Sequence, residues 1–200
     1  MKKKLILVAA PPASGKNRVC DALAARLHPV TVLDKDDLAP LVNRLFDATG
    51  NDRDMDGAFY GAHIRDAEYE TLFRLAEAAL RHMDLVFVNA PLGREIRDPA
   101  FLSSLRARIR EAGAGLYVIW LLADPQVCRE RMLRRAAPRD AGKLRDWDAY
   151  VRRVRYDPPV GLVEAGAADA LFLFDTLTEA GFSASLDAAV SLLSDERQMR

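Results

Sequence analysis

A segment near the N-terminus has the residue types and spacing of a phosphate-binding loop. It reads APPASGKN at positions 10–17 and follows a short apolar run. Such a loop needs a tight turn whose backbone N–H groups point inward, a lysine for the β- and γ-phosphates, and a helix N-terminus. The spacing matches GxxxxGK(S/T), but Ala10 replaces the first glycine and Asn17 replaces the hydroxyl residue that ligates Mg²⁺. Alanine is tolerated where φ is negative, and an amide oxygen can ligate a hard cation.

We therefore expect this loop to bind nucleotide phosphates. The alternative is an ordinary strand-to-helix turn with Lys16 on the surface. A lysine at a helix start opposes the helix dipole, and the chain has six lysines against 23 arginines, so a bound anion is the favoured explanation. The expected nucleotide ligands are Pro12, Ala13, Ser14, Gly15, Lys16, Asn17 and Arg18.

Three carboxylates follow a second apolar run, in LDKDDL at positions 33–38. Strand ends of an open α/β sheet face the ligand pocket, and a carboxylate there can orient a substrate hydroxyl and accept its proton. Asp37 fits the N-cap of the following helix. Asp34 would either help to hold Mg²⁺ through water or simply end the strand.

Five arginines lie between positions 129 and 139. Arg131 and Arg135 are four residues apart, so on a helix they project from one face. Guanidinium groups of a closing lid can stabilise the charge on a transferring phosphoryl group, which predicts catalytic roles for these two and a nucleotide contact for Arg139. The alternative is a solvated basic helix face.

The elements that must position these residues alternate along the chain. Apolar runs at 5–9, 30–33, 85–88, 116–122 and 170–174 lack polar alternation, as is typical of parallel strands covered on both faces. Stretches with helical spacing lie at 16–27, 37–47, 57–82, 99–112, 125–137 and 178–193. This alternation predicts a doubly wound α/β fold, with irregular and mobile segments at 49–59 and 136–148.

Four segments together resemble phosphate-loop (P-loop) kinases of the AAA_33 and zeta-toxin-like type. They are APPASGKN, LDKDDL, LVFVNAPLG at 85–93 and CRERMLRRAAPRDAGKLRDWDAY at 128–150. The resemblance covers residues 3 to about 156. It implies a P-loop three-layer sandwich with a five-stranded parallel sheet in the order 2-3-1-4-5. The whole chain, 1–200, would form one domain, with a helical acceptor-side region at about 40–82 and a small arginine-rich lid at about 128–150.

The resemblance also implies roles for individual residues. In these kinases an Asp after the second strand orients or deprotonates the acceptor hydroxyl, and the matching position is Asp36; a second helix-capping residue is the alternative. P-loop proteins often carry a Mg²⁺-linked Asp at the third strand end, where this chain has Asn89. We expect the acceptor substrate to contact Asp36 and Asn89. Arg65 and Arg94 would bind an anionic group of the acceptor, or else pair with nearby acidic residues.

Composition restricts the function classes. The chain has 29 basic and 29 acidic residues, so its formal net charge is zero and an extended nucleic-acid-binding surface is not expected. Its two cysteines form no metal-binding pattern, and no run approaches the length of a membrane span. We expect a cytoplasmic monomer or weak dimer that does not bind membranes.

The predicted activity is transfer of the γ-phosphate of ATP, with Mg²⁺, to a hydroxyl of a small-molecule or nucleotide-type acceptor. Two alternatives stay open. The amides at positions 17 and 89 would suit a nucleotide-binding regulatory module with a degraded metal site and little turnover. The resemblance also allows a zeta-toxin-like kinase that acts on a nucleotide sugar.

Overall fold

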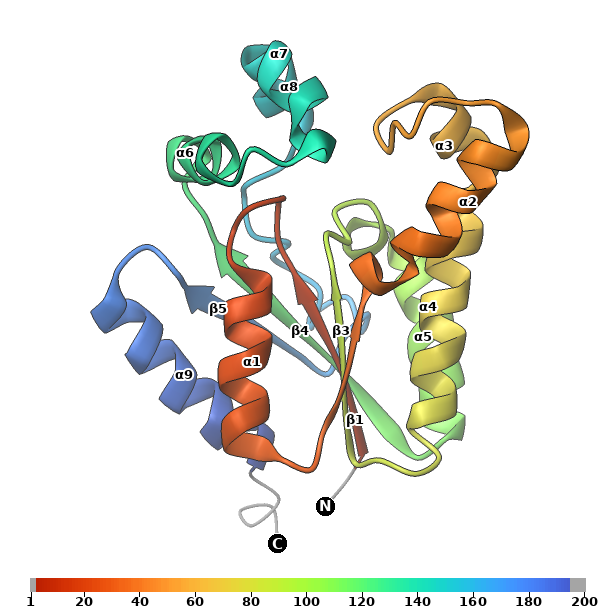
Figure 1. Ribbon diagram of the computed structural model, residues 1–200. Helices are drawn as coiled ribbons and strands as arrows, with labels where there is room; N and C mark the ends of the chain where they lie inside the picture. The colour runs from red at the N-terminus through yellow and green to blue at the C-terminus, as the bar shows by residue number, and fades with distance from the viewer. Residues whose placement is uncertain (1–2, 195–200) are drawn as a thin grey trace, which may run out of the picture.

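The computed structural model describes residues 3–194 and arranges them in three layers, with a sheet between two layers of helices (Figure 1). The strands are β1 (Lys3–Ala9), β2 (Thr31–Asp34), β3 (Leu85–Ala90), β4 (Ala114–Leu122) and β5 (Ala170–Asp175). Their order is β2-β3-β1-β4-β5, and all neighbouring strands are parallel. The α/β fold class and the strand order are confirmed.

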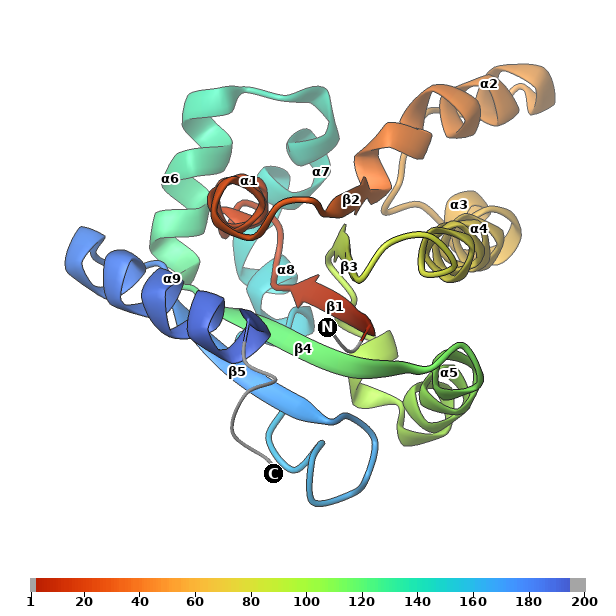
Figure 2. The same cartoon turned by 90° about the horizontal axis from the view of Figure 1, so that it is seen from below.

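Helices cover both faces of the sheet, as the view from below shows (Figure 2). α1 (Lys16–Leu27) and α9 (Glu179–Ser194) lie on one face, and α4 (Arg65–Ala79) and α5 (Pro99–Glu111) lie on the other. A hydrophobic core lies on each face of the sheet, and alternate residues of β1 point into one or the other. Leu5 and Leu7 pack toward α4 and α5, whereas Ile6 and Val8 pack toward α1 and α9. All four are fully buried, which explains why this strand has no polar alternation.

Two helical arms stand beyond the carboxyl ends of the strands (Figure 1). The first arm, residues 39–64, contains α2 (Ala39–Thr49) and α3 (Ala58–His63) and has a small core of its own around Phe46 and Tyr60. The second arm, residues 125–153, contains α6 (Pro125–Arg135), α7 (Ala141–Arg145) and α8 (Trp147–Arg153). Its core is formed by Cys128, Met132, Trp147 and Tyr150. Within residues 3–194, no helix has the length and apolar content that a membrane crossing would require.

Three local predictions are wrong. The expected helix at 57–82 is broken at Ile64, whose backbone (φ −119°, ψ −46°) separates α3 from α4 while its side chain is buried in the core of the first arm. The segment 136–148 is more regular than expected, since it contains a 3-10 helix (Pro138–Asp140) and α7. Asp37 caps no helix: α2 begins after Leu38 without a side-chain cap, and Asp34 instead caps the preceding 3-10 helix, Lys35–Leu38.

Candidate active site

The loop between β1 and α1 has the geometry of an anion cradle. Ala13 (φ 65°) and Gly15 (φ 95°) have left-handed backbone conformations, and Gly15 is the N-cap of α1. Ser14 is buried, and its Oγ donates a hydrogen bond to the carbonyl of Pro11 at 2.6 Å, which closes the turn. Ala10 is fully buried and is not among the left-handed residues of the described chain, so its methyl group fits as expected. Among the described residues no side chain caps α1, which leaves its first N–H groups available to phosphate oxygens.

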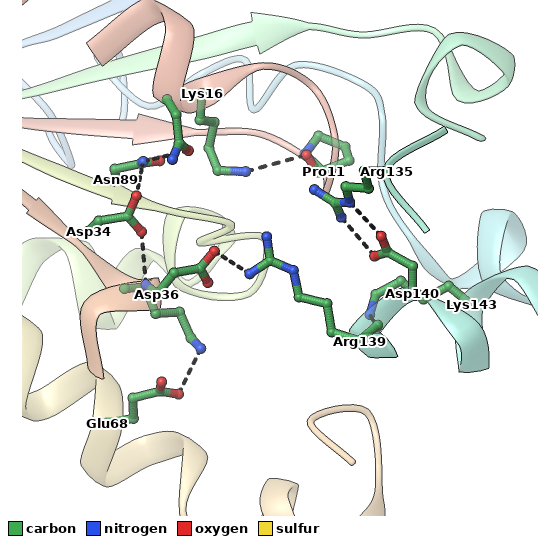
Figure 3. A network of polar contacts seen from close by, with 12 residues as sticks. Pro11, Lys16, Asp34, Asp36, Glu68, Asn89, Arg135, Arg139, Asp140 and Lys143 are labelled. Atoms are coloured by element: carbon green, nitrogen blue, oxygen red, sulfur yellow. Dashed lines mark hydrogen bonds and ion pairs between the residues drawn. The ribbon is translucent and has the colours of Figure 1, made fainter. Parts of the chain in front are cut away.

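Lys16 lies inside this loop. Its Nζ donates long hydrogen bonds to the carbonyls of Ala10 (3.3 Å) and Pro11 (3.5 Å), and within residues 3–194 no ion pair joins it to a carboxylate (Figure 3). Burial lowers the pKa of Lys16 to about 8, although the carboxylates of Asp36 and Asp34 partly oppose this shift by favouring the ammonium form. A partly buried ammonium group that, within residues 3–194, is held by two distant carbonyls is well suited to receive phosphate oxygens.

Asn89, at the end of β3, links the two predicted metal ligands. Its Nδ2 donates to Asn17 Oδ1 at 3.0 Å and to Asp34 Oδ2 at 2.7 Å, while its own Oδ1 is buried with no partner among residues 3–194 (Figure 3). Burial raises the pKa of Asp34, and the nearby Asp36 and Asp37 add to this, while the hydrogen bond from the Asp36 N–H opposes it.

These residues suit Mg²⁺. The donors are all oxygens and include one carboxylate, and Mg²⁺ in kinases usually takes one or two carboxylates together with phosphates and water. Asn17 Oδ1 and Asp34 Oδ2 each keep a free lone pair after accepting from Asn89. The described residues contain no cluster of three His, Cys, Asp or Glu side chains that could hold a metal, so phosphate and water would have to complete the coordination.

Asp36 lies in the 3-10 helix Lys35–Leu38, directly after the carboxyl end of β2. Its N–H donates to Asp34 Oδ1 at 2.8 Å, which fixes the turn. Its carboxylate accepts a hydrogen bond from Arg139 Nη1, in the second arm (Figure 3). Both side chains of this pair are about half exposed. The structure thus brings together the predicted acceptor-activating residue and one predicted lid arginine.

A buried cluster behind Asp36 was not predicted. Lys35 Nζ forms an ion pair with Glu68 Oε2 at 2.8 Å, and the Tyr60 hydroxyl donates to the same oxygen at 2.5 Å. Lys35 and Glu68 are both buried, and the ammonium faces the rings of Tyr60 and Tyr69 at 5.5 and 5.7 Å. Scarcity of lysine was the only sequence signal for Lys35, since its partners come from α3 and α4, more than 20 positions away.

The two predicted catalytic arginines of α6 do not line the same cavity. Arg131 Nη1 donates to the carbonyl of Ala13 at 3.2 Å, so this residue braces the phosphate loop from outside. Arg135 instead makes a two-pronged ion pair with the buried Asp140, at 2.5 and 2.7 Å. Arg135 therefore faces the space between the arms, and Arg131 faces the back of the loop.

One cavity of about 780 Å³ joins these parts. Phosphate-loop residues, the ends of β2 and β3, and both arms line it, and a volume of this size accommodates a small-molecule ligand. The predicted site residues in its wall are Pro12, Ala13, Gly15, Lys16, Asn17, Asp34, Asp36, Arg65, Asn89, Arg94, Arg135 and Arg139.

Arg65 and Arg94 are both held by carboxylates. Arg65 Nη2 donates to the buried Glu95 at 2.6 Å, and its guanidinium lies 4.4 Å from the centre of the Tyr69 ring. Arg94 is mostly exposed and lies 3.5 Å from Asp66. The pairing that was weighed as the alternative is therefore present for both residues, although both still line the cavity.

A second cavity, of about 260 Å³, lies behind the phosphate loop. Arg18 lines it, with its guanidinium 3.9 Å from the centre of the Phe182 ring and ion-paired to Glu179 at 2.5 Å. The remaining lining residues are Ser14, Gly15, Arg131, Arg134 and Thr176. Arg134 belongs to the arginine cluster at 129–139 but was assigned no role there, and Thr176 belongs to none of the sequence motifs.

Solved structures with this fold are numerous. The chain resembles a protein from Chloroflexus aurantiacus J-10-fl that is provisionally assigned as a kinase (21% identity, 99% of this chain and 100% of the other, TM-score 0.65). It also resembles a gluconokinase from Sinorhizobium meliloti 1021 (18%, 95% and 95%, 0.56) and a shikimate kinase from Bacteroides thetaiotaomicron (15%, 95% and 98%, 0.53). At these identities the likeness shows a shared P-loop kinase fold.

A comparison with curated proteins finds no match. The model of the family AAA_33, described as an AAA domain, matches residues 5–156, about three quarters of the chain and nearly the span over which the sequence motifs lie. The chain therefore belongs to the AAA_33 family.

Proposed function

We propose that this protein is an ATP-dependent phosphotransferase that moves the γ-phosphate of ATP to a hydroxyl group. The observation that carries the proposal is that Lys16 and Asp36 line one cavity, with Arg135 and Arg139 reaching into it from the second arm. A phosphate-binding cation, a carboxylate for the acceptor and guanidinium groups near the phosphates are the parts that phosphoryl transfer requires.

The phosphate loop would hold the triphosphate. Its backbone N–H groups and the start of α1 favour negative charge, and Lys16 would exchange its long bonds to Ala10 and Pro11 for phosphate oxygens. Asn17 and Asp34 would hold Mg²⁺, which would supply charge neutralisation to the phosphates. The nucleotide base would bind in the second cavity. This cavity adjoins Gly15, and the stacked side chains of Arg18 and Phe182 line it.

Asp36 would act on the acceptor. Its carboxylate accepts the proton of the acceptor hydroxyl while the hydroxyl oxygen bonds to the γ-phosphorus and the bond from that phosphorus to the β–γ bridging oxygen breaks, releasing ADP. Asp36 is paired with Arg139, so this step requires Arg139 to leave the carboxylate. The transferring phosphoryl group is the natural new partner of that guanidinium.

Three variants test the proposal. ATP with Mg²⁺ should raise the melting temperature of the wild type, and Lys16→Ala should abolish that shift. Asp36→Asn should keep the shift but lose ADP release, and Asp37→Asn is the matched control because Asp37 is exposed and does not line the cavity. The absence of a shift with any nucleoside triphosphate would refute nucleotide binding, and equal loss in both Asp variants would refute the role of Asp36.

A second candidate function is a nucleotide-binding regulatory module with little turnover. The Asn17–Asn89 hydrogen bond favours it, because an amide donor stands where a metal-binding carboxylate is common. Single-turnover phosphate transfer by the wild type and by Asn17→Thr separates the two functions. A faster Asn17→Thr variant would support the module, whereas wild-type turnover that Asp36→Asn abolishes would exclude it.

A further inference from the structure

The cations that line the large cavity are almost all neutralised. Seven form ion pairs: Lys35 with Glu68, Arg65 with Glu95, Arg94 with Asp66, Arg135 with Asp140, Arg139 with Asp36, Lys143 with Asp56 and Arg155 with Asp157. Within residues 3–194, Lys16 and Arg153 are the lining cations without such a pair. Positive charge is therefore without an ion-pair partner at Lys16 in the phosphate loop and at Arg153 in α8, whereas Lys35, Arg65 and Arg94, beyond Asp36, are each paired with a carboxylate.

The two innermost pairs are hard to separate. Glu68 and Glu95 are buried, and they lie 2.8 Å from Lys35 Nζ and 2.6 Å from Arg65 Nη2. A carboxylate or phosphate of an incoming ligand could take either cation only by leaving a buried glutamate without its counter-charge. Removal of one partner from a buried pair is strongly destabilising, so an anionic ligand gains little here.

Hydrogen-bonding capacity is nevertheless left over. The Lys35 ammonium has three donors, and within residues 3–194 Glu68 is the one carboxylate that pairs with it. The Tyr60 oxygen still has acceptor capacity after donating to Glu68. In the cavity wall itself, Asp36 and Tyr60 offer acceptor oxygens beside the donors of Lys35 and Arg65. Hydroxyl groups both donate and accept, whereas carboxylates and phosphates at neutral pH only accept.

The same part of the cavity has aromatic walls. Tyr60 and Tyr69 both line it, with ring centres 5.5 and 5.7 Å from Lys35 Nζ, and their rings offer apolar surface next to the polar groups. Flat aromatic faces beside rigid donors and acceptors suit the alternating C–H and O–H groups of a sugar-like ring.

We propose that the acceptor is an uncharged, polyhydroxylated molecule of sugar-like or cyclitol-like chemistry, bound between Asp36, Lys35, Tyr60 and Arg65. This inference rests on the proposed function and specifies its substrate class. The ion pairs hold the donors in place, and the pairing of Lys35, Arg65 and Arg94 with carboxylates selects against phosphorylated and carboxylated relatives of the same acceptor.

Matched pairs of compounds test this class. Wild-type protein with Mg²⁺ and a non-hydrolysable ATP analogue is titrated with glucose and glucuronate, galactose and galacturonate, ribose and ribose 5-phosphate, and inositol and inositol 1-phosphate. The melting temperature reports binding, and ADP release with ATP reports transfer. We expect the compounds that respond to be neutral, each bound at least about tenfold more tightly than its anionic partner. Tighter binding of the anionic members, or no response to any neutral member, overturns the inference.

Two variants test the physical cause. Glu95→Gln and Asp66→Asn each release an arginine from its carboxylate and should shift the preference toward the anionic member of a pair by about tenfold. Asp66 is exposed, so its variant should fold even if Glu95→Gln does not. Glu70→Gln, on the exposed surface of α4, is the control. An unchanged preference in a folded Asp66→Asn protein contradicts the proposed role of charge balance.

The ATP analogue separates this inference from the proposed function. If the analogue raises the melting temperature of the wild type but not of Lys16→Ala, the nucleotide site stands and the compound pairs judge the acceptor alone. If the analogue has no effect on the wild type, the proposed nucleotide binding is refuted, whatever the compound pairs show.

Discussion

The guanidinium of Arg139 lies against the carboxylate of Asp36, although 103 positions separate them in the sequence. The contact joins the second arm to the end of β2, and a second one, between Lys143 and Asp56 at 2.6 Å, joins the same arm to the loop between α2 and α3. The second arm thus bridges the cavity through two ion pairs. If Asp36 is the proton acceptor, as proposed, movement of the second arm would free its carboxylate.

Arg139→Gln should slow transfer far more than it weakens ATP binding. The variant loses a guanidinium that can follow the phosphoryl charge, and loss of one such donor lowers kcat by about 100-fold in other enzymes. Steady-state ADP release measures kcat, and the melting shift with ATP measures binding. Arg152→Gln is the control, since Arg152 is exposed on α8 and does not line the cavity. Equal kcat values in the two variants would show that Arg139 has no catalytic part.

Glu68→Gln should destabilise the fold strongly. It leaves the buried Lys35 ammonium without its carboxylate, a change that costs about 3–5 kcal/mol in the free energy of unfolding. Glu70→Gln, two residues away on α4, breaks only an exposed pair with Arg74 and should cost under about 0.5 kcal/mol. Urea unfolding followed by circular dichroism measures both.

A double variant checks the cause of that loss. Lys35→Met combined with Glu68→Gln removes both charges, so it should be less destabilised than Glu68→Gln alone. If the double variant is instead the less stable of the two, the ion pair is not what stabilises this cluster.

The layered fold could be predicted because its signals are local. The apolar runs of β1 and β4 are buried on both faces, and the phosphate loop is a contiguous motif. The break at Ile64 was missed because an isoleucine fits the helical spacing on both sides of it. Its position is set by burial against Phe46, in another helix.

The site was predictable only in part, for a related reason. Asn89 lies at the end of β3, and Lys16 and Asp36 come after the ends of β1 and β2, so sequence order places all three at one edge of the sheet. Their partners are set by tertiary contacts: Arg139 reaches Asp36, and Asn89 reaches both Asn17 and Asp34. No local pattern marks such pairs, and the same is true of Glu68 beneath Lys35.

Asn89→Asp should make the protein sensitive to Mg²⁺ without nucleotide. In the wild type the Asn89 amide donates to Asn17 and Asp34. A carboxylate would face these two acceptors instead, so repulsion should lower the melting temperature, and Mg²⁺ should restore it by bridging the oxygens. Melting curves with and without millimolar Mg²⁺ measure this, with Ca²⁺ and Na⁺ as ionic controls. A variant that melts like the wild type in both conditions would argue against a metal position between these residues.

ATP affinity should fall as the pH rises above about 8, the pKa to which burial lowers Lys16 in the unliganded protein. Bound phosphate favours the ammonium form, so the pKa of Lys16 is higher in the ATP complex than in the free protein. Above pH 8, where Lys16 of the free protein is neutral, ATP binding therefore takes up a proton. Affinity is therefore constant below pH 8 and falls above it, approaching about tenfold per pH unit. The contribution of Lys16 to the free energy of unfolding changes in the opposite direction. Lys16 has a pKa of 10.5 in the unfolded chain, so between pH 8 and 10.5 the unfolded chain binds more protons than the folded protein, and stability rises with pH. Lys16→Arg keeps its charge and should remove the slope when a fluorescent ATP analogue is titrated from pH 7 to 9.5, whereas the same slope in both proteins would assign the titration to another group.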